Sequence, residues 1–249
     1  MSIRCAVVGV GHLGRFHAQK YALIPEAKLV GVCDVSPEAG RKVGAELDVP
    51  VFSDARELLG RVDAVTIAAS TAAHYELCKL FLGNGVHVLV EKPITTTSAQ
   101  AAEICDLAER AGVRLQVGHI ERYNPALRAV RAKLRQPMFV ECHRLAPITT
   151  RSSDVDVVRD LMIHDLDVIL SLIHSKPKLV SAVGAPVLTD DLDIANARIE
   201  FESGAVANVT ASRVSLNTQR KFRVFQRDQY LSIDFQTGEV NLLTKTGDW

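Results

Sequence analysis

The stretch that decides the fold stands near the start of the chain, Gly9-Val10-Gly11-His12-Leu13-Gly14. It matches the pattern G-x-G-x-x-G, follows the apolar run from Cys5 to Val8 directly, and opens a helical pattern. Glycines at this spacing allow a tight turn, close approach of a pyrophosphate, and close packing of helix on strand. The helix that follows offers free backbone N–H groups to the anion. We therefore expect this segment to bind a dinucleotide through Gly9, Gly11, His12, Leu13 and Gly14.

An acidic residue completes the dinucleotide pattern. Asp34 ends the next apolar run, 20 residues after Gly14. A carboxylate at this place accepts hydrogen bonds from the adenosine ribose hydroxyls and repels a 2′-phosphate. Val35 and Ser36 supply no arginine beside it. NAD is therefore favoured over NADP, while Arg41 and Lys42 on the following helix keep NADP as the alternative.

The rest of the first half alternates short apolar runs with helical patterns. The apolar runs begin at Cys5, Leu29, Ala64, Val86 and Arg114, and the helical patterns cover residues 13–24, 37–47, 72–82 and 98–111. Thr71 and Ser98 are expected N-caps, and Gly112 is expected to end the last of these helices. Apolar strands that alternate with helices predict a parallel sheet covered on both faces. We expect a doubly wound Rossmann domain over residues 1–120.

The pattern changes at about residue 121. Asn124-Pro125 is expected to open a helix that continues to about Arg135, and a longer helix is expected from about Asp156 to Ile173. Strand-like segments cover residues 138–145, 178–188, 194–201, 205–214, 221–226, 230–235 and 240–245. Short polar connections between them suggest hairpins. We expect an α+β domain with a mainly antiparallel sheet over residues 121–249.

Composition limits the class of partner. Of the 249 residues, 29 are Lys or Arg and 29 are Asp or Glu, so a whole-chain attraction to nucleic acid or to a membrane surface has no support. The longest stretch without a charge, from Ala64 to Tyr75, is only 12 residues, too short for a membrane span. The five cysteines contain no CxxC pair, which argues against a zinc site or a disulfide framework and for the cytoplasm.

Two segments place reactive groups where the ligands of such sheets bind, beyond the carboxyl ends of the strands. Ser70 and His74 follow one strand, and Glu91-Lys92-Pro93 ends the next. By itself Lys92 reads as a solvated charge at a strand end. Beside a nicotinamide, however, a lysine can stabilise the alkoxide that forms as hydride leaves.

The expected helix from Asp156 to Ile173 carries a third set. At about 100° per residue, Asp160, His164, Asp167 and Ser171 fall in one narrow stripe, and nearly all the remaining surface is apolar. A narrow polar stripe on a buried helix is expected to face a cavity. A histidine near a carboxylate suits general-base chemistry, although a purely structural His–Asp pair fits the helix equally well.

Together these motifs resemble the glucose-fructose oxidoreductase and inositol dehydrogenase family. That family joins a Rossmann domain carrying Glu-Lys-Pro to an α/β domain carrying Asp-x-x-x-His. The resemblance implies that Lys92, Asp160 and His164 are catalytic and that His74 lies near the nicotinamide. It also implies an oxidoreductase with cofactor contacts at the glycine segment, Asp34, Ser70, Glu91 and Lys92.

A closer resemblance is to a branch that oxidises C3 of UDP-N-acetylglucosamine. It rests on the segments 118–125, 142–147, 193–201 and 210–215. The resemblance implies substrate contacts at Arg122, Tyr123 and Asn124, and a homo-oligomer formed through the second sheet. Independently of it, Arg122, Arg144, Arg151 and Arg213 could supply charge for a diphosphate, although each alone is more often a surface arginine. Family members run several tens of residues longer, so we expect the second domain to lack its last strands.

Other functions stay open at this point. The enzyme could act on another sugar or an inositol, and Lys92 rather than His164 could be the base. A non-catalytic dinucleotide sensor would not need Lys92 or His164, yet both are present. A reductase of an imine or a pyrrole is disfavoured by the Asp160 and His164 pair.

Overall fold

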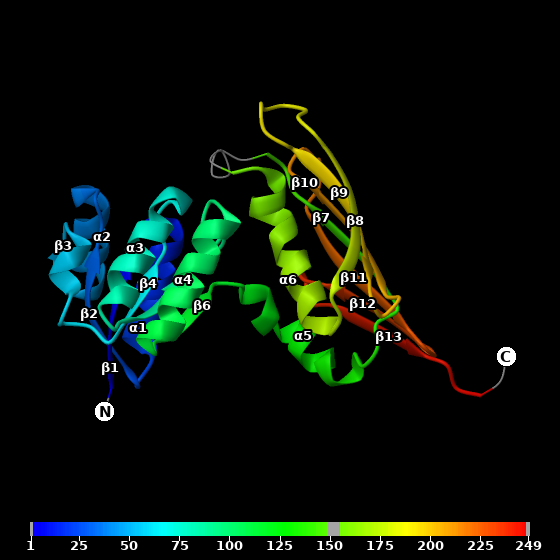
Figure 1. Cartoon of the computed structure of the whole chain (residues 1–249), viewed down its shortest axis with the longest axis horizontal. Helices are drawn as coiled ribbons and strands as arrows, with labels where there is room; N and C mark the ends of the chain where they lie inside the picture. The colour runs from blue at the N-terminus through cyan, green and yellow to red at the C-terminus, as the bar shows by residue number, and fades with distance from the viewer. Residues whose placement is uncertain (1, 149–154, 248–249) are drawn as a thin grey trace. The chain divides into compact units, whose positions relative to one another are not determined.

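The computed structural model describes residues 2–148 and 155–247. The chain forms two compact units, divided between Gly118 and His119. Each unit has its own sheet and its own hydrophobic core (Figure 1).

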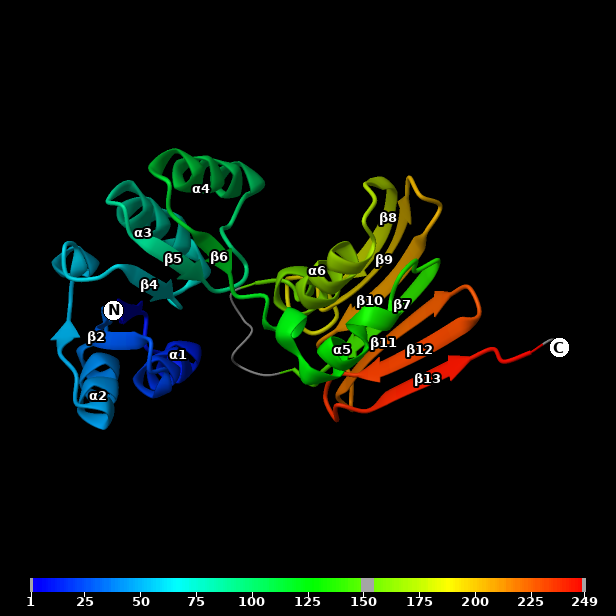
Figure 2. The ribbon, with the colours of Figure 1, turned by 90° about the horizontal axis from the view of Figure 1, so that it is seen from below.

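The first unit is a parallel six-stranded sheet in the order β3-β2-β1-β4-β5-β6. The strands are β1 (Ile3–Val8), β2 (Ala27–Cys33), β3 (Val51–Phe52), β4 (Ala64–Ile67), β5 (His87–Val90) and β6 (Leu115–Val117). The helices are α1 (His12–Leu23), α2 (Pro37–Leu47), α3 (Thr71–Gly83) and α4 (Ser98–Ala111). Helices α1 and α2 lie on one face and α3 and α4 on the other (Figure 2). This is the doubly wound Rossmann fold that the sequence predicts.

Two of the expected helix caps were wrong by one residue. The N-caps of α3 and α4 are Ser70 and Thr97, and the Thr97 hydroxyl accepts a hydrogen bond from the backbone N–H of Gln100 at 3.2 Å. Runs of neighbouring Ser and Thr residues, such as Thr95 to Ser98, offer several equivalent caps, so residue type alone does not choose among them. Gly112 does end α4, in the left-handed conformation with φ 66°.

The second unit is a seven-stranded sheet in the order β13-β12-β11-β7-β10-β9-β8. The strands are β7 (Phe139–Leu145), β8 (Pro177–Ala185), β9 (Ile194–Phe201), β10 (Val206–Ser212), β11 (Gln219–Gln226), β12 (Gln229–Asp234) and β13 (Val240–Thr244). All neighbours are antiparallel except β7 and β10, which confirms the expected mainly antiparallel sheet. Helices α5 (Pro125–Val130) and α6 (Ile163–Leu172) cover one face (Figure 2).

The first helix of the second unit is shorter than expected, and the second is irregular at its start. Asn124 caps α5 by accepting from the Ala126 N–H at 3.0 Å, as predicted, but after Val130 the chain continues only as a 3-10 turn, Arg131–Lys133. The long helix is confirmed over residues 158–172, but its first part, Val158–Met162, is a π-helical turn that leads directly into α6. Among the described residues, no helix combines the length and the apolar composition needed to cross a membrane.

Candidate cofactor site and active-site residues

The glycine segment forms a tight turn between β1 and α1. Gly9 has φ +82°, and a Cβ there would lie 2.5 Å from the backbone nitrogen of Ala69. A Cβ on Gly14 would lie 1.8 Å from the carbonyl oxygen of Gly9, so this glycine lets the helix approach the turn. A Cβ on Gly11 would meet no atom within 4 Å. The three glycines therefore have different roles: two permit backbone packing, and Gly11 leaves open the space in front of the helix.

That open space has the chemistry that a pyrophosphate needs. Helix α1 begins at His12 with Gly11 as its N-cap, and no side chain among the described residues caps it. The positive end of a 12-residue helix therefore faces the space beside Gly11. The turn thus fits a bound dinucleotide.

Asp34 lies at the end of β2 beside this turn. Its Oδ2 accepts from the Val10 N–H at 2.7 Å, and its Oδ1 accepts from the Ser36 N–H at 2.8 Å. A carboxylate has about four acceptor positions, so it can hold the glycine turn and still accept from two hydroxyls. This geometry is compatible with ribose recognition.

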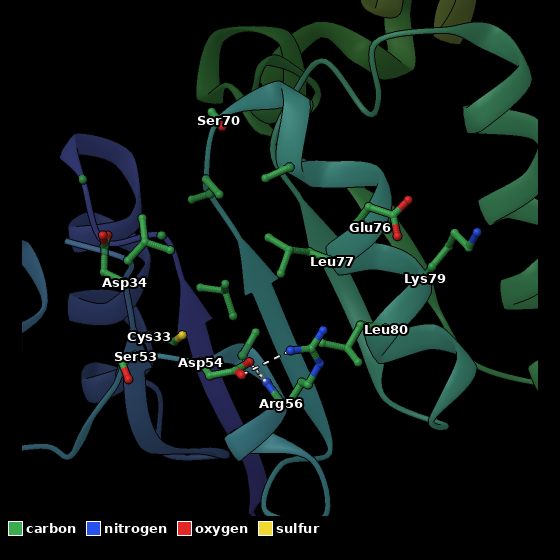
Figure 3. Close-up of a pocket in the computed structure, with 18 residues that line it drawn as sticks. Cys33, Asp34, Ser53, Asp54, Arg56, Ser70, Glu76, Leu77, Lys79 and Leu80 are labelled. Atoms are coloured by element: carbon green, nitrogen blue, oxygen red, sulfur yellow. Dashed lines mark hydrogen bonds and ion pairs between the residues drawn. The ribbon is translucent and has the colours of Figure 1, made fainter. Parts of the chain in front are cut away.

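A cleft of about 1010 Å³ starts at the turn and lies within the first unit (Figure 3). Its lining includes Gly9, Gly11, Asp34 and Ser70, four of the residues expected to bind the cofactor. Helix α3 contributes Leu77 and Leu80 as an apolar wall. A smaller hollow of about 410 Å³ adjoins Gly11 and is lined by His12, with Arg15 and Lys42 among its basic residues. Leu13 is half-exposed on the first turn of α1.

Sequence reasoning missed the floor of this cleft, which Ser53, Asp54 and Arg56 form. They follow β3, a strand of only two residues, Val51–Phe52. Residues that follow a strand of a parallel sheet lie at the edge where ligands bind, because all the strands have their carboxyl ends there. A strand of two residues, however, is too short to show a strand pattern in the sequence. Cys33 also lines the cleft. The pKa of its thiol is raised to about 11, mainly by burial and secondly by the charge of Asp34.

Lys92 follows β5 at the same carboxyl edge of the sheet. It is half-buried, and its backbone N–H donates to Glu91 Oε2 at 3.2 Å. Glu91 itself is only 7% exposed, and its Oε1 lies 2.7 Å from Nε2 of His17 on helix α1. The Glu91 carboxylate therefore ties the lysine segment to the glycine-rich helix.

His74 is a buried contact between two segments at this edge of the sheet. It lies in the first turn of α3 with 1% exposure. Its Nδ1 is 2.9 Å from the Pro93 carbonyl oxygen and its Nε2 is 3.0 Å from the Ala69 carbonyl oxygen. The ring thus bridges the segment after β4 and the segment after β5, and it is too buried to present an edge to a ligand.

In the second unit, the π-helical turn changes the expected stripe. Asp160 lies inside the turn and His164 is the second residue of α6, and both are half-buried. The rotation of 100° per residue does not hold through a π turn, so the predicted alignment applies only within α6, to His164, Asp167 and Ser171, and does not extend to Asp160. Ser171 donates to the Val168 carbonyl of its own helix at 2.8 Å, and Leu170 on the expected buried side is 50% exposed. Single π turns in helices are frequent at functional sites.

Two of the arginines expected at the substrate are internal. Arg144 is 3% exposed and pairs with Asp165 and Glu121, and Arg213 is 4% exposed and pairs with Asp193. Their charges are already balanced by buried carboxylates, so the expectation that they present charge to a diphosphate is corrected. Arg151 lies outside the described residues.

The expected segment 122–124 lies on a 3-10 turn, Ile120–Tyr123, and the cap that follows it. Tyr123 is 61% exposed. Arg122 is exposed but holds Asp167 with two contacts of 2.6 and 2.7 Å. The amide oxygen of Asn124 caps α5, and its nitrogen donates to Glu121 Oε2 at 3.1 Å.

Comparison with known proteins agrees with this geometry. Residues 3–119 match the model of an oxidoreductase family with an NAD-binding Rossmann fold, and residues 126–232 match the GFO/IDH/MocA C-terminal domain. UDP-N-acetylglucosamine 3-dehydrogenase of Acidithiobacillus ferrooxidans is 42% identical over 241 residues, which are 96% of this chain and 76% of that protein. The chain belongs to the GFO/IDH/MocA oxidoreductase family.

Further relatives lie in the same family. The scyllo-inositol 2-dehydrogenase (NAD(+)) of Bacillus subtilis is 32% identical over 232 residues, 86% of this chain and 68% of that protein. Among solved structures, that of the Acidithiobacillus enzyme superposes with a TM-score of 0.94 over 98% of this chain and 81% of its own. The scyllo-inositol dehydrogenase of Lactobacillus casei, with a TM-score of 0.84 over 94% of this chain and 76% of its own at 24% identity, shows the shared fold.

Family membership identifies the cofactor of the first unit. The protein is an NAD-dependent oxidoreductase of the GFO/IDH/MocA family that acts on CH–OH groups. The turn at Gly9 to Gly14, the α1 N-terminus and Asp34 are the parts of the structure that fit NAD.

Proposed function

We propose that the protein oxidises the C3 hydroxyl of UDP-N-acetylglucosamine with NAD as the hydride acceptor. The observation that carries this proposal is the 42% identity, over nearly the whole chain, with a UDP-N-acetylglucosamine 3-dehydrogenase. Lys92, Asp160 and His164 supply the residue types that such an oxidation needs.

The residue roles form the second part of the proposal. When bound, NAD accepts the hydride from the carbon that carries the hydroxyl. His164 takes the hydroxyl proton, Asp160 orients and tunes His164, and Lys92 donates a hydrogen bond to the oxygen as negative charge develops on it. The alternative is that Lys92 itself takes the proton. Arg122 and Tyr123, which are exposed on the turn before α5, are proposed substrate contacts, and Asn124 positions that turn.

The deciding experiment uses UDP-N-acetylglucosamine deuterated at C3. We expect NADH formation, a slowed rate with the deuterated sugar, and transfer of the deuterium to the cofactor. A coupled aminotransferase with its amino donor removes the 3-keto product and pulls the reaction forward. Deuterium that stays on the sugar would contradict oxidation at C3.

A second candidate is an inositol dehydrogenase, favoured by the 32% identity with the Bacillus subtilis enzyme. Assaying myo- and scyllo-inositol beside the UDP-sugar distinguishes the two. A higher kcat/KM for an inositol would replace the nucleotide sugar as the proposed substrate.

We also propose that the protein is a homo-oligomer assembled through the C-terminal sheet and that it works in the cytoplasm. Strand β8 supports the first point, because all nine of its residues are exposed, including Leu179, Val180 and Val183. The cysteines support the second, because all five are free thiols, of which only Cys105 is exposed.

A further inference from the structure

Two buried arginines hold the helix that carries Asp160 and His164, one on each side of the π-helical turn. Arg144 stands near the end of β7, and Arg213 directly follows β10. These two strands are parallel neighbours, with Arg144 paired to Ala211 and Leu145 to Ser212. Arg144 and Arg213 therefore lie at the same end of these two paired strands.

Arg144 binds the helix at Asp165, the residue after His164. Its Nε and Nη2 each donate to Asp165 at 2.9 Å, and its Nη1 donates to Glu121 at 3.1 Å. Burial raises the pKa of Asp165, and the charge of Arg144 opposes that shift. The planar fork meets one carboxylate with two bonds, which fixes direction as well as distance.

Arg213 binds the chain at Val155, shortly before the π turn. Its Nη1 donates to the Val155 carbonyl at 2.8 Å, while its Nε donates to Asp193 at 2.8 Å and its Nη2 to the Thr189 hydroxyl at 2.9 Å. Asp193 is fully buried and also accepts from three successive backbone N–H groups, Val187, Leu188 and Thr189, at 2.6 to 2.8 Å. Burial alone would raise the pKa of Asp193, but these N–H donors and Arg213 hold it far below its usual value.

Between these two contacts lies the π-helical turn, Val158–Met162. A π turn is uncommon and persists where surrounding contacts fix it. Here the chain is held at Val155 and at Asp165, and the π turn and His164 fall between those points.

We propose that Arg144 and Arg213 are positioning residues that clamp the π-helical turn and so fix Asp160 and His164 for catalysis. This rests on the proposed function of those two residues. The arginines act through the helix backbone and Asp165, and they do not bind the substrate diphosphate themselves.

The test compares Arg144→Lys, Asp165→Asn and Arg213→Lys with Arg223→Lys as the matched control. Arg223 also pairs with a carboxylate of β7, Glu141, at 2.7 Å, but both side chains are one-third exposed. Lysine keeps the charge and loses the fork, so folding is preserved in the expected case. We expect kcat to fall about 10- to 100-fold in the three clamp variants, as for residues that orient catalytic groups, while KM for the sugar and Kd for NAD stay within about twofold. The control should keep the wild-type kcat.

A second measurement does not depend on turnover. Hydrogen exchange of the amides from Val158 to His164 should quicken in the clamp variants and stay unchanged in Arg223→Lys.

The kcat of the double variant Arg144→Lys with Asp165→Asn should be little lower than that of either single variant, because the two substitutions remove the same interaction.

The outcomes that overturn the clamp differ from those that overturn the proposed function. A raised KM for the sugar with unchanged kcat would make Arg144 a substrate ligand. Unchanged amide hydrogen exchange in segment 158–164 would contradict the proposed clamp even if kcat fell. If wild-type protein oxidises an inositol and not the UDP-sugar, the substrate proposal fails, and the same comparison with the inositol still decides the clamp.

Discussion

At the scale of single residues, exposure and existing partners separate the ligand-facing groups from the structural ones. Gly11 faces open space, whereas Gly9 and Gly14 face backbone. Lys92 is half-buried at the sheet edge, whereas its neighbour Glu91 is buried and bonded to His17. Adjacent residues of one motif therefore differ in burial and in contacts, and the proposed chemical role falls to Lys92 alone.

The first prediction concerns Lys92. Replacing it with alanine should lower turnover by about 10²–10³, because one preorganised donor to the developing alkoxide is lost. The Kd for NAD should stay near the wild-type value, since the glycine turn and Asp34 are untouched. Steady-state kinetics and cofactor titration check both points, with Lys28→Ala, an exposed lysine of β2, as the control. Normal turnover of Lys92→Ala would show that the residue is only a surface charge.

The second prediction concerns cofactor choice at Asp34. The wild-type protein should bind NAD more tightly than NADP, because the carboxylate repels a 2′-phosphate. Asp34→Ser should weaken NAD binding and narrow the difference between the two cofactors. Titration calorimetry with both cofactors measures this, and tighter binding of NADP by the wild type would show that Lys42 and the adjoining hollow dominate.

The third prediction uses the thiols as reporters of the cleft. With its pKa raised to about 11, Cys33 should be almost fully protonated at pH 8, with a thiolate fraction of about one in a thousand. Alkylation at pH 8 should therefore modify the exposed Cys105 long before Cys33. Higher pH should speed the reaction of Cys33, and NAD should slow it, because Cys33 lines the cleft. Mass spectrometry of the peptides follows each site. Equal rates for Cys33 and Cys105, or no effect of NAD on Cys33, would contradict the assignment of the cleft.

At the scale of elements, the π-helical turn and the start of α6 hold the two residues proposed to carry the chemistry of the second domain. Asp160 lies within the turn and His164 two residues beyond it, and the flanking residues Val155 and Asp165 are bonded to arginines from the sheet. Turn and α6 therefore act as one element whose position the sheet sets.

The fourth prediction belongs to this element. Turnover should rise with pH through one ionisation as His164 becomes neutral, and His164→Ala should remove that limb and cost about 10²–10⁴ in rate. Asp160→Asn should move the midpoint of the limb and keep the Kd for NAD. The double variant should be little worse than His164→Ala, because the two residues act as a unit. A pH limb that survives in His164→Ala would assign the base role to Lys92.

At the scale of the whole molecule, the two units differ in how many faces of their sheet are covered by helices. The parallel sheet has helices on both faces, whereas α5 and α6 cover only one face of the seven-stranded sheet (Figure 2). Strand β9 shows the consequence: Ala195, Ala197, Ile199 and Phe201 are buried, while the residues between them are exposed or half-buried. An apolar edge strand such as β8 beside an open face is typical of an interface between subunits.

The fifth prediction tests this surface. Val183 on β8 is 72% exposed, and replacing it with aspartate should shift the molar mass from oligomer toward monomer. Leu216, 97% exposed on the loop after β10, is the matched control, since the same change there should leave the mass unchanged. Light scattering after size exclusion provides the mass. A monomeric wild type, or an equal effect of Leu216→Asp, would contradict assembly through the sheet.

The sequence by itself determined the features that rest on local patterns. The glycine turn, the alternation of strands and helices, the antiparallel second sheet and the cap at Asn124 follow from residue type and spacing, because short-range geometry produces them. Tertiary structure alone decided which polar residues face a ligand and which face each other. By residue type, four buried side chains look like ligand-binding residues: Arg144, Arg213, Glu91 and His74. Each is buried against a partner 19 to 74 positions away in the chain. The π turn, too, is invisible to a periodicity of 3.6, because that periodicity assumes a regular α-helix, and the contacts that flank the turn come from β7 and from the end of β10. Burial and pairing across the chain are properties of the packed molecule, and no local pattern carries them.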